Sequence, residues 1–283
     1  MVIGGSRGIG AAIVSRLAQD GAAVRFTYSG SQAAAESLAE RTGANAVHSD
    51  AANRDALVAS VREAGPIDIL VINAGLYLGG DPLQLDPDAV DRMIDVNVRA
   101  PYHAAVEAAR RMPEGGRIIA IGSVNGDRVP YGGSAAYALT KSALQGMARG
   151  LARDFGPRGI TVNVVQPGPT DTEMNPADGP LKDQMHAVMA IKRHGTADEV
   201  ASLVAYLAGP DARGITGAMH TIDGGFGACE WLTARSNRIL SGPRRRRAPY
   251  GAAISGSPAS GSRATTRRSS ALPCSSSGKR PSR

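Results

Sequence analysis

Cysteine is scarce in this 283-residue sequence, which contains only Cys229 and Cys274. Because neither lies in residues 1–228, disulfides have no part in the fold of that segment, as is usual in a reducing cytoplasm. The sequence has no signal peptide and no apolar run of the roughly 18 residues that a membrane-spanning helix needs. It therefore predicts a soluble cytoplasmic protein with no membrane segment.

Acidic residues are scarce only near the C-terminus. Residues 229–283 hold twelve of the 32 Lys and Arg residues but a single acid, Glu230, so this segment carries +11. Residues 1–228 therefore carry −4, although the whole chain carries +7. The basic excess is thus no evidence that residues 1–228 bind nucleic acid.

The segment 229–283 differs from the rest of the chain in composition. It is rich in Ser, Arg, Gly and Pro, has little apolar periodicity, and is predicted to be a disordered basic C-terminal tail. Three interpretations remain open: a nucleic-acid-binding arm through Arg244–Arg247, a membrane tether without an amphipathic helix, or a non-native extension. We favour the extension, because the composition changes abruptly after a complete domain, residues 1–228.

Within residues 1–228, short apolar runs alternate with amphipathic segments. Runs such as IDILVIN and RIIAIGS are typical of buried parallel strands. We expect strands near 2–3, 23–28, 44–48, 67–72, 117–121, 160–165 and 218–222. We expect helices near 11–21, 32–42, 54–64, 88–111, 135–155 and 197–208. This alternation predicts a single-domain α/β fold, a Rossmann-like doubly wound parallel sheet of three layers.

A glycine-rich turn follows the first strand. Gly4, Gly8 and Gly10 separate Val2 and Ile3 from an apolar helical stripe. Glycines there let the backbone approach a pyrophosphate, and the free N–H groups of the helix N-terminus favour an anion. The turn therefore predicts a dinucleotide cofactor.

The end of the second strand indicates which dinucleotide binds. An NAD site usually has an acid there for the ribose 2′-hydroxyl, but this sequence has none before Glu36. Arg7, Ser29 and Ser31 instead offer a guanidinium and hydroxyls, which suit a 2′-phosphate. The sequence predicts NADP(H) rather than NAD(H).

Tyr137 and Lys141 are four residues apart in a predicted helix, so they share one face. An ammonium beside a phenol is expected to lower the tyrosine pKa from its usual value of about 10. The phenol would then exchange protons near neutral pH. Ser123 adds a hydroxyl for the same reacting oxygen.

Together these motifs resemble the short-chain dehydrogenase/reductase family in its single-domain form, over residues 2–228. GGSRGIG looks like the cofactor turn, Asp50-Ala51 like the adenine-contacting pair, and Asn73-Ala74-Gly75 like the NAG motif. Asn97, Ser123, Tyr137 and Lys141 match the catalytic set, and PGPTDTEMN looks like the segment that contacts the nicotinamide amide. The cofactor contacts that the resemblance implies are Gly4, Ser6, Arg7, Gly8, Ile9, Gly10, Ser29, Asp50, Ala51, Asn73, Ala74, Gly75, Tyr137, Lys141, Pro167, Gly168, Thr170 and Thr172.

The resemblance also implies a role for each catalytic residue. Tyr137 would exchange a proton with the substrate oxygen, which Ser123 orients, and Lys141 would lower the Tyr137 pKa and bind the nicotinamide ribose. Asn97 would anchor a water that connects Lys141 to solvent. The helices near 88–111 and 135–155 would pair subunits in a homodimer or homotetramer. Residues 169–195 would form a substrate lid.

Two departures from the family pattern stand out. Ile3 replaces the threonine that usually ties the glycine turn to a neighbouring strand, which should loosen the turn slightly. The first strand is also truncated, so either the true start lies upstream or the chain is less stable than its relatives.

Two functions from different classes remain open. One is an NADPH-dependent carbonyl reductase acting on a small carbonyl or alcohol. The other is a cyclic-di-GMP-binding regulator of biofilm dispersal on the same fold, because runs such as GSVNGDR and MAIKRHG are similar to a member of that kind. We interpret the Arg-x-x-Asp of Arg92 and Asp95 as a solvated or subunit-facing pair. In the lid, Met174, Leu181, Met185 and Met189 either line a pocket or pack a short helix. No metal site is predicted, since His186 and His194 lack ligand spacing.

Overall fold

The computed structural model describes residues 1–228. The predicted disordered tail, with its basic run Arg244–Arg247, lies outside the described residues. None of the helices in the described part of the chain has both the length and the apolar character needed to cross a bilayer.

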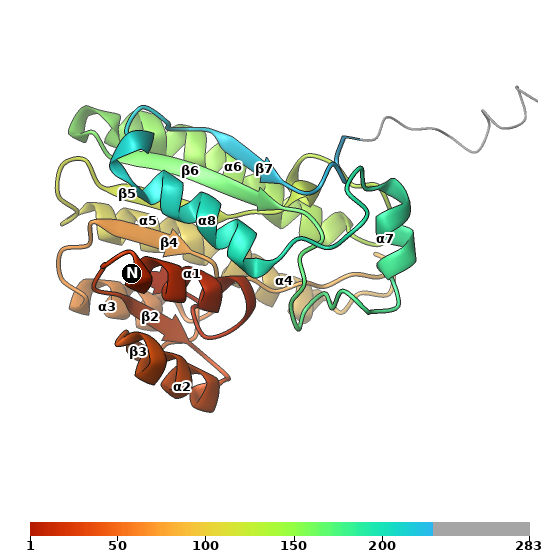
Figure 1. The fold of residues 1–283 in the computed structure, drawn as a ribbon, viewed down its shortest axis with the longest axis horizontal. Coiled ribbons are helices and arrows are strands. Elements are labelled where there is room, and N and C mark those ends of the chain that lie inside the picture. Colours follow the sequence, from red (N-terminus) through yellow and green to blue (C-terminus); the bar gives the residue numbers. More distant parts are fainter. Residues whose placement is uncertain (229–283) are drawn as a thin grey trace, which may run out of the picture. The chain divides into compact units, whose positions relative to one another are not determined.

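One parallel sheet of seven strands organises the described residues (Figure 1). Its order is β3-β2-β1-β4-β5-β6-β7, and every neighbouring pair is parallel. The strands are β1 Val2–Ile3, β2 Arg25–Tyr28, β3 Asn45–His48, β4 Ile69–Ile72, β5 Arg117–Ile121, β6 Thr161–Pro167 and β7 Met219–Ile222. The strand order reverses between β1 and β4, which confirms the doubly wound fold.

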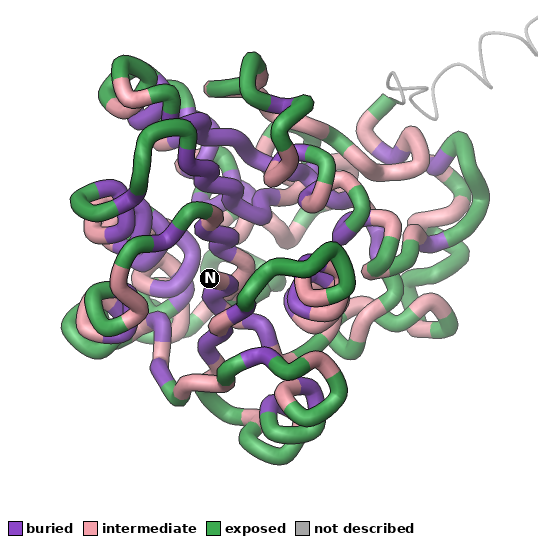
Figure 2. The backbone as a smooth tube through the Cα atoms, turned by 60° about the vertical axis from the view of Figure 1, so that its left-hand side comes forward, coloured by how far each residue is buried: buried purple, intermediate pink, exposed green. Residues whose placement is uncertain are grey.

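Helices cover both faces of the sheet, giving three layers (Figure 1). They are α1 Gly8–Gln19, α2 Gln32–Thr42, α3 Arg54–Glu63, α4 Pro87–Ile94, α5 Ala100–Ala109, α6 Ala135–Phe155, α7 Lys182–Val188 and α8 Ala197–Ala208. Apolar side chains of α1, α2 and α8 form one core with the sheet, and those of α3, α5 and α6 form the other. The central strands β1, β5 and β6 are buried along their whole length, and β4 is buried except at Ile69 (Figure 2).

Alternation along the strands supplies both cores. In β4, Leu70 and Ile72 face the α3–α5–α6 core, whereas Val71 faces the α1–α2–α8 core. Because successive strand side chains point to opposite faces, a strand buried on both faces must be apolar throughout. The unbroken apolar run of this strand therefore follows from its central place.

The predicted helices are confirmed, with one irregularity. The segment predicted near 88–111 is α4, a π-helical turn at Asp95–Arg99, and α5 in succession. Asp86 caps its start by accepting the Asp88 amide, and Pro87 occupies the first turn. Strands β1 and β5 have the predicted bounds, and the ends of the other strands differ from prediction by at most two residues; β6 runs on to Pro167, and β4 starts only at Ile69.

Candidate functional site

A cavity of about 980 Å³ opens at the carboxyl edge of the sheet, where the strand order reverses. All but two of the predicted site residues line it. The exceptions are Gly10, which packs against Gly4, and Asn97, which hydrogen-bonds with Leu76; both Gly4 and Leu76 line the cavity. The structure thus brings together segments far apart in the sequence, although their roles stay predictions.

The glycine turn is held against the start of the segment after β4. Gly4 has φ +78°, and a β-carbon there would lie 2.7 Å from the Ala74 backbone. A β-carbon on Gly10 would lie 2.1 Å from the Gly4 carbonyl oxygen, closer than any side chain tolerates. Asn73 Nδ2 donates to that same oxygen at 2.6 Å. Gly10 therefore shapes the turn without reaching the cavity.

Thr27 ties the glycine turn to a neighbouring strand, which is the role that the family's threonine usually has at the position of Ile3. The Gly4 amide donates to Thr27 Oγ1 at 3.0 Å, and the Gly5 amide donates to the Thr27 carbonyl at 2.8 Å. Thr27 is buried in the neighbouring strand β2. The predicted loosening of the turn is thus offset from the adjacent strand, while Ile3 fills the core.

At the adenosine end of the cavity, Arg7 extends from the glycine turn to the lid. Its Nη1 lies 2.7 Å from Glu173 Oε2, and both side chains are largely exposed. Ser29 lines the cavity after β2, and its carbonyl oxygen lies 3.0 Å from His48 Nε2. The Arg7 guanidinium therefore lines the cavity, as predicted from the sequence, and it forms an ion pair with the Glu173 carboxylate.

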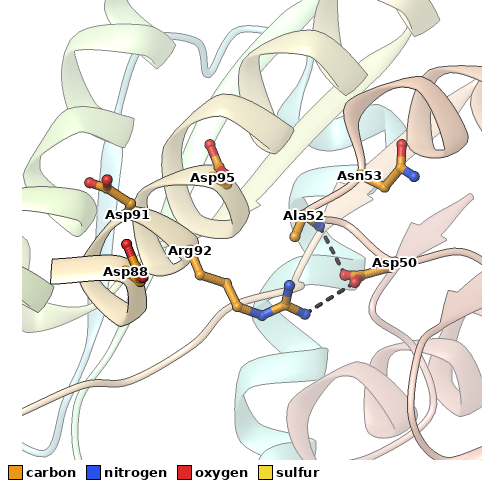
Figure 3. Close-up of a pocket in the computed structure, with 7 residues that line it drawn as sticks. All are labelled: Asp50, Ala52, Asn53, Asp88, Asp91, Arg92 and Asp95. Carbon is orange, nitrogen blue, oxygen red and sulfur yellow. Dashed lines mark hydrogen bonds and ion pairs between the residues drawn. The ribbon is translucent and has the colours of Figure 1, made fainter. Parts of the chain in front are cut away.

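Asp50 and Arg92 form a second ion pair, at 3.1 Å, where the cavity meets a smaller hollow of about 420 Å³ (Figure 3). Arg92 reaches across from α4 to the Asp50 carboxylate, which also accepts the Ala52 amide at 3.0 Å. Partial burial opposes ionisation of Asp50, but these two donors outweigh it and hold its pKa below the ordinary value. Asp95 instead pairs with Arg99 at 2.6 Å. Arg92 and Asp95 therefore serve separate ion pairs.

Tyr137 and Lys141 lie on one face of α6, and they line the cavity together with Ser123, which follows β5 by two residues. Lys141 is buried, and its Nζ donates to the Ile121 carbonyl at 3.0 Å. It lies 5.7 Å from the centre of the Tyr137 ring. Burial lowers the Lys141 pKa to about 8.

The predicted lowering of the Tyr137 pKa is wrong for this geometry. Burial raises the pKa of Tyr137 to about 12, and a hydrogen bond with the Ser123 hydroxyl offsets only part of that rise. The physical reason is that the Lys141 ammonium is directed at the Ile121 carbonyl rather than the phenol oxygen. Tyr137 therefore holds its proton throughout the neutral range.

Asn97 sits in the π-helical turn, a local feature that is frequent at functional sites. Its Oδ1 accepts the Leu76 amide at 2.8 Å, and its Nδ2 donates to the Leu76 carbonyl and to Thr140 Oγ1. Thr140 in turn donates to the Tyr137 carbonyl at 2.7 Å. Asn97 thus fixes the segment after the NAG motif and, through Thr140, the first turn of α6. Sequence reasoning missed Thr140, since nothing in its spacing marks it.

The segment after β6 faces the glycine turn. Thr170 donates to the Gly168 carbonyl at 3.0 Å, and Thr172 Oγ1 accepts the Asn175 amide at 3.3 Å. A β-carbon on Gly8 would lie 3.3 Å from Thr172 Cγ2. Pro167, Gly168, Thr170 and Thr172 all line the cavity, opposite the start of α1.

The predicted lid, residues 169–195, contributes apolar side chains to the cavity. Met174, Leu181 and Met185 line it, whereas Met189 is buried against Val124 and Phe226. Three of the four side chains therefore line a pocket, as one of the two predicted alternatives has it, and Met189 follows the other alternative and packs in the interior. His186 Nε2 lies 2.9 Å from His194 Nδ1, a contact across eight residues that spacing did not reveal.

Comparisons with known proteins place these features among oxidoreductases. Residues 4–227 match the family described as Enoyl-(Acyl carrier protein) reductase. The Cyclic-di-GMP-binding biofilm dispersal mediator protein of Escherichia coli (strain K12) is 66% identical over 228 residues, which are 81% of this chain and 96% of that protein. The 3-oxoacyl-[acyl-carrier-protein] reductase MabA of Mycobacterium tuberculosis (strain ATCC 25618 / H37Rv) is 38% identical over 230 residues, 80% of this chain and 92% of MabA.

A solved structure agrees with the fold. The crystal structure of BdcA in complex with NADPH superposes with a TM-score of 0.80 at 66% sequence identity. The match covers 81% of this chain and 94% of that chain. The likeness therefore extends over nearly all of the described residues.

Proposed function

The chain belongs to the short-chain dehydrogenase/reductase family, and from that premise we propose that it is an NADP(H)-dependent oxidoreductase acting on a carbonyl or alcohol. The observation that carries the proposal is one cavity with Ser123, Tyr137 and Lys141 on its wall and the glycine turn at its other end. The likeness to MabA, named as a reductase, and to a structure with NADPH supports it.

The residues present fit NADP(H). The N-terminus of α1 begins at Gly8 in the cavity wall, where its free amides and helix dipole favour a pyrophosphate. Tyr28, Ser29, Gly30 and Ser31 line the adenosine end, and none is acidic. The Arg7 guanidinium is exposed, and among the described residues it pairs with Glu173, so a 2′-phosphate, a stronger acceptor, would take the place of that carboxylate.

Cofactor choice gives a direct test of the Arg7 assignment. We expect calorimetric titration of the full chain to show NADPH binding at least about tenfold more tightly than NADH, because a charge-assisted hydrogen bond contributes roughly 1.5–3 kcal/mol. Arg7→Gln should remove most of that preference and leave NADH affinity unchanged. Arg16→Gln, which breaks an exposed pair with Asp20 elsewhere on α1, is the matched control. Tighter binding of NADH, or an equal loss for both cofactors, would contradict the assignment.

The chain's own groups then hold and move the proton. NADPH, when bound, supplies the hydride. The Tyr137 hydroxyl donates its proton to the substrate oxygen during reduction, and Ser123 orients that oxygen. Lys141, buried beside the Tyr137 ring, would bind the nicotinamide ribose of the cofactor. Asn97 and Thr140 position the segment after the NAG motif and the first turn of α6.

Cyclic-di-GMP binding is a second candidate, favoured by the 66% identity to a protein named for it. We propose that such a ligand binds the half of the cavity that holds Arg7 and Arg92, since its phosphates need cations. Calorimetry with cyclic-di-GMP, with and without saturating NADPH, tests this. Micromolar affinity abolished by NADPH supports the regulator, whereas no binding at millimolar ligand removes it.

Subunit pairing and location complete the proposal. Tyr102 on α5 and Leu139 on α6 are large apolar side chains that are about half exposed or more. They support the homodimer or homotetramer predicted through these helices. A cytoplasmic location is proposed from the lack of cysteine in residues 1–228.

A further inference from the structure

The cavity has two chemically different halves. We define the substrate half by six aromatic and apolar side chains that share the cavity wall with Ser123 and Tyr137: Leu76, Tyr77, Val129, Tyr131, Met185 and Phe226. The Tyr77 ring stands edge-on to the Tyr137 ring, with centres 5.0 Å apart. The Tyr131 and Phe226 rings pack edge-on at 6.0 Å. Aromatic and apolar surfaces therefore surround the site next to the reacting hydroxyl.

Charged side chains of the cavity lie outside this half. Arg7 pairs with Glu173 and Asp50 pairs with Arg92, all at the dinucleotide end. The Lys141 ammonium is turned to the Ile121 carbonyl. These five are the charged residues among the described residues that line the cavity, and the six side chains of the substrate half are all uncharged.

The hydroxyls of this half are directed at the protein. Tyr131 donates to the Gln184 carbonyl at 2.6 Å, which also ties the wall to lid helix α7. The Tyr77 hydroxyl lies 3.5 Å from Ser134 Oγ. The two tyrosines thus offer mainly their rings, whose edges and faces suit another aromatic ring.

We propose that the substrate is an uncharged carbonyl compound bearing an aromatic group, such as an aryl ketone, and that anionic carbonyl compounds are excluded. This inference rests on the proposed function. The reaction is ketone plus NADPH plus a proton giving the secondary alcohol plus NADP⁺: hydride adds to the carbonyl carbon, and the Tyr137 proton goes to the oxygen. An anionic group would lose its water in the substrate half without gaining a counter-charge, which is unfavourable.

A matched pair of substrates tests the charge preference. Methyl 4-acetylbenzoate and 4-acetylbenzoate share an aryl ketone and differ in one ester against one carboxylate. We expect the full chain to reduce the ester with a kcat/KM about 100-fold higher or more, because the carboxylate would be buried unpaired. Equal or better use of the carboxylate would overturn the proposal.

A cation added to the rim should reverse part of this preference. Leu181 lines the cavity and is 52% exposed, so an arginine there is tolerated by the fold. We expect Leu181→Arg to raise kcat/KM for 4-acetylbenzoate about fivefold to tenfold, whereas Leu181→Gln, similar in length but neutral, should not. An equal gain in both variants would show that charge is not what excludes the anion.

Binding separates this inference from the proposed function. The quenching of NADPH fluorescence by the two ketones can be measured with Tyr137→Phe, in which no turnover occurs. Tighter binding of the ester than of the carboxylate supports the proposed substrate class. If wild type nevertheless turns over neither ketone, that lack of turnover counts against the oxidoreductase function and not against the substrate class. Equal binding of both would overturn the substrate class alone.

Discussion

Tyr137→Phe should lower kcat for NADPH-dependent ketone reduction by at least about 10³-fold, with the affinity for NADPH retained. The variant loses the phenol hydroxyl that hydrogen-bonds with Ser123 in the cavity wall, and with it the proposed proton donor. Because burial keeps the Tyr137 pKa at about 12, that hydroxyl is fully protonated at neutral pH and serves as the acid in reduction. The ring, its packing against Tyr77 and the α6 backbone are unchanged.

The controls for this variant distinguish chemistry from structure. Tyr206→Phe makes the same change on α8, at a tyrosine that is 51% exposed and lines no part of the cavity. Stopped-flow or steady-state oxidation of NADPH gives kcat, and fluorescence titration gives NADPH affinity. If Tyr137→Phe kept more than a tenth of wild-type kcat, another group would have to be the proton donor.

The fold could be predicted from sequence because each of its signals is local. A run such as Leu70–Ile72 is apolar on both faces, which is typical of a central parallel strand. The glycine turn and the i, i+4 pair Tyr137 and Lys141 likewise depend on short spacings. Parallel topology then brings the carboxyl ends of β1, β4 and β5 to one edge, and the predicted site residues meet there.

What spacing does not encode is the choice of partner across the cavity. Thr27 replaces the expected tie at Ile3 from a strand 23 residues away, and Glu173 reaches Arg7 from 166 residues away. Tyr77, Tyr131 and Phe226 meet around the substrate half although no motif links them. Their pairing depends on loop conformation, which single residues specify weakly.

The orientation of the Lys141 side chain explains why the predicted lowering of the Tyr137 pKa is wrong. Helical spacing places its ammonium on the same face as Tyr137, but the four-carbon stem leaves the choice of acceptor open. The nearby end of β5 offers the Ile121 carbonyl, and burial makes an oriented acceptor valuable. Burial therefore raises the pKa of Tyr137 and lowers the pKa of Lys141, and no attraction between the ammonium and a phenolate offsets these shifts.

Lys141→Met should make the protein more stable at neutral pH while removing its activity. Burial lowers the Lys141 pKa from 10.5 to about 8, and each pKa unit corresponds to about 1.4 kcal/mol, so the buried ammonium costs on the order of 3 kcal/mol. Methionine fills the same space without charge but leaves the Ile121 carbonyl unpaired, at a cost of about 1 kcal/mol. We expect a net gain of about 2 kcal/mol in the free energy of unfolding at pH 7.

The sign of the pH dependence identifies the cause of that gain. Below pH 8 the lysine is protonated in both the folded and unfolded states, so the full penalty is present. Between pH 8 and about 10.5 the unfolded state binds more protons, and the wild-type protein becomes more stable as pH rises. The advantage of Lys141→Met should therefore shrink over this window and change to a slight loss near pH 10.5.

Urea unfolding at pH 7 and pH 10 measures this difference, with Lys192→Met as the control at an exposed lysine. A destabilised Lys141→Met at pH 7 would mean that the Ile121 carbonyl compensates the charge fully. The expected opposite outcome, higher stability with no turnover, argues that this lysine is kept for chemistry. A residue that only supported the fold would not be a cation buried at a net cost.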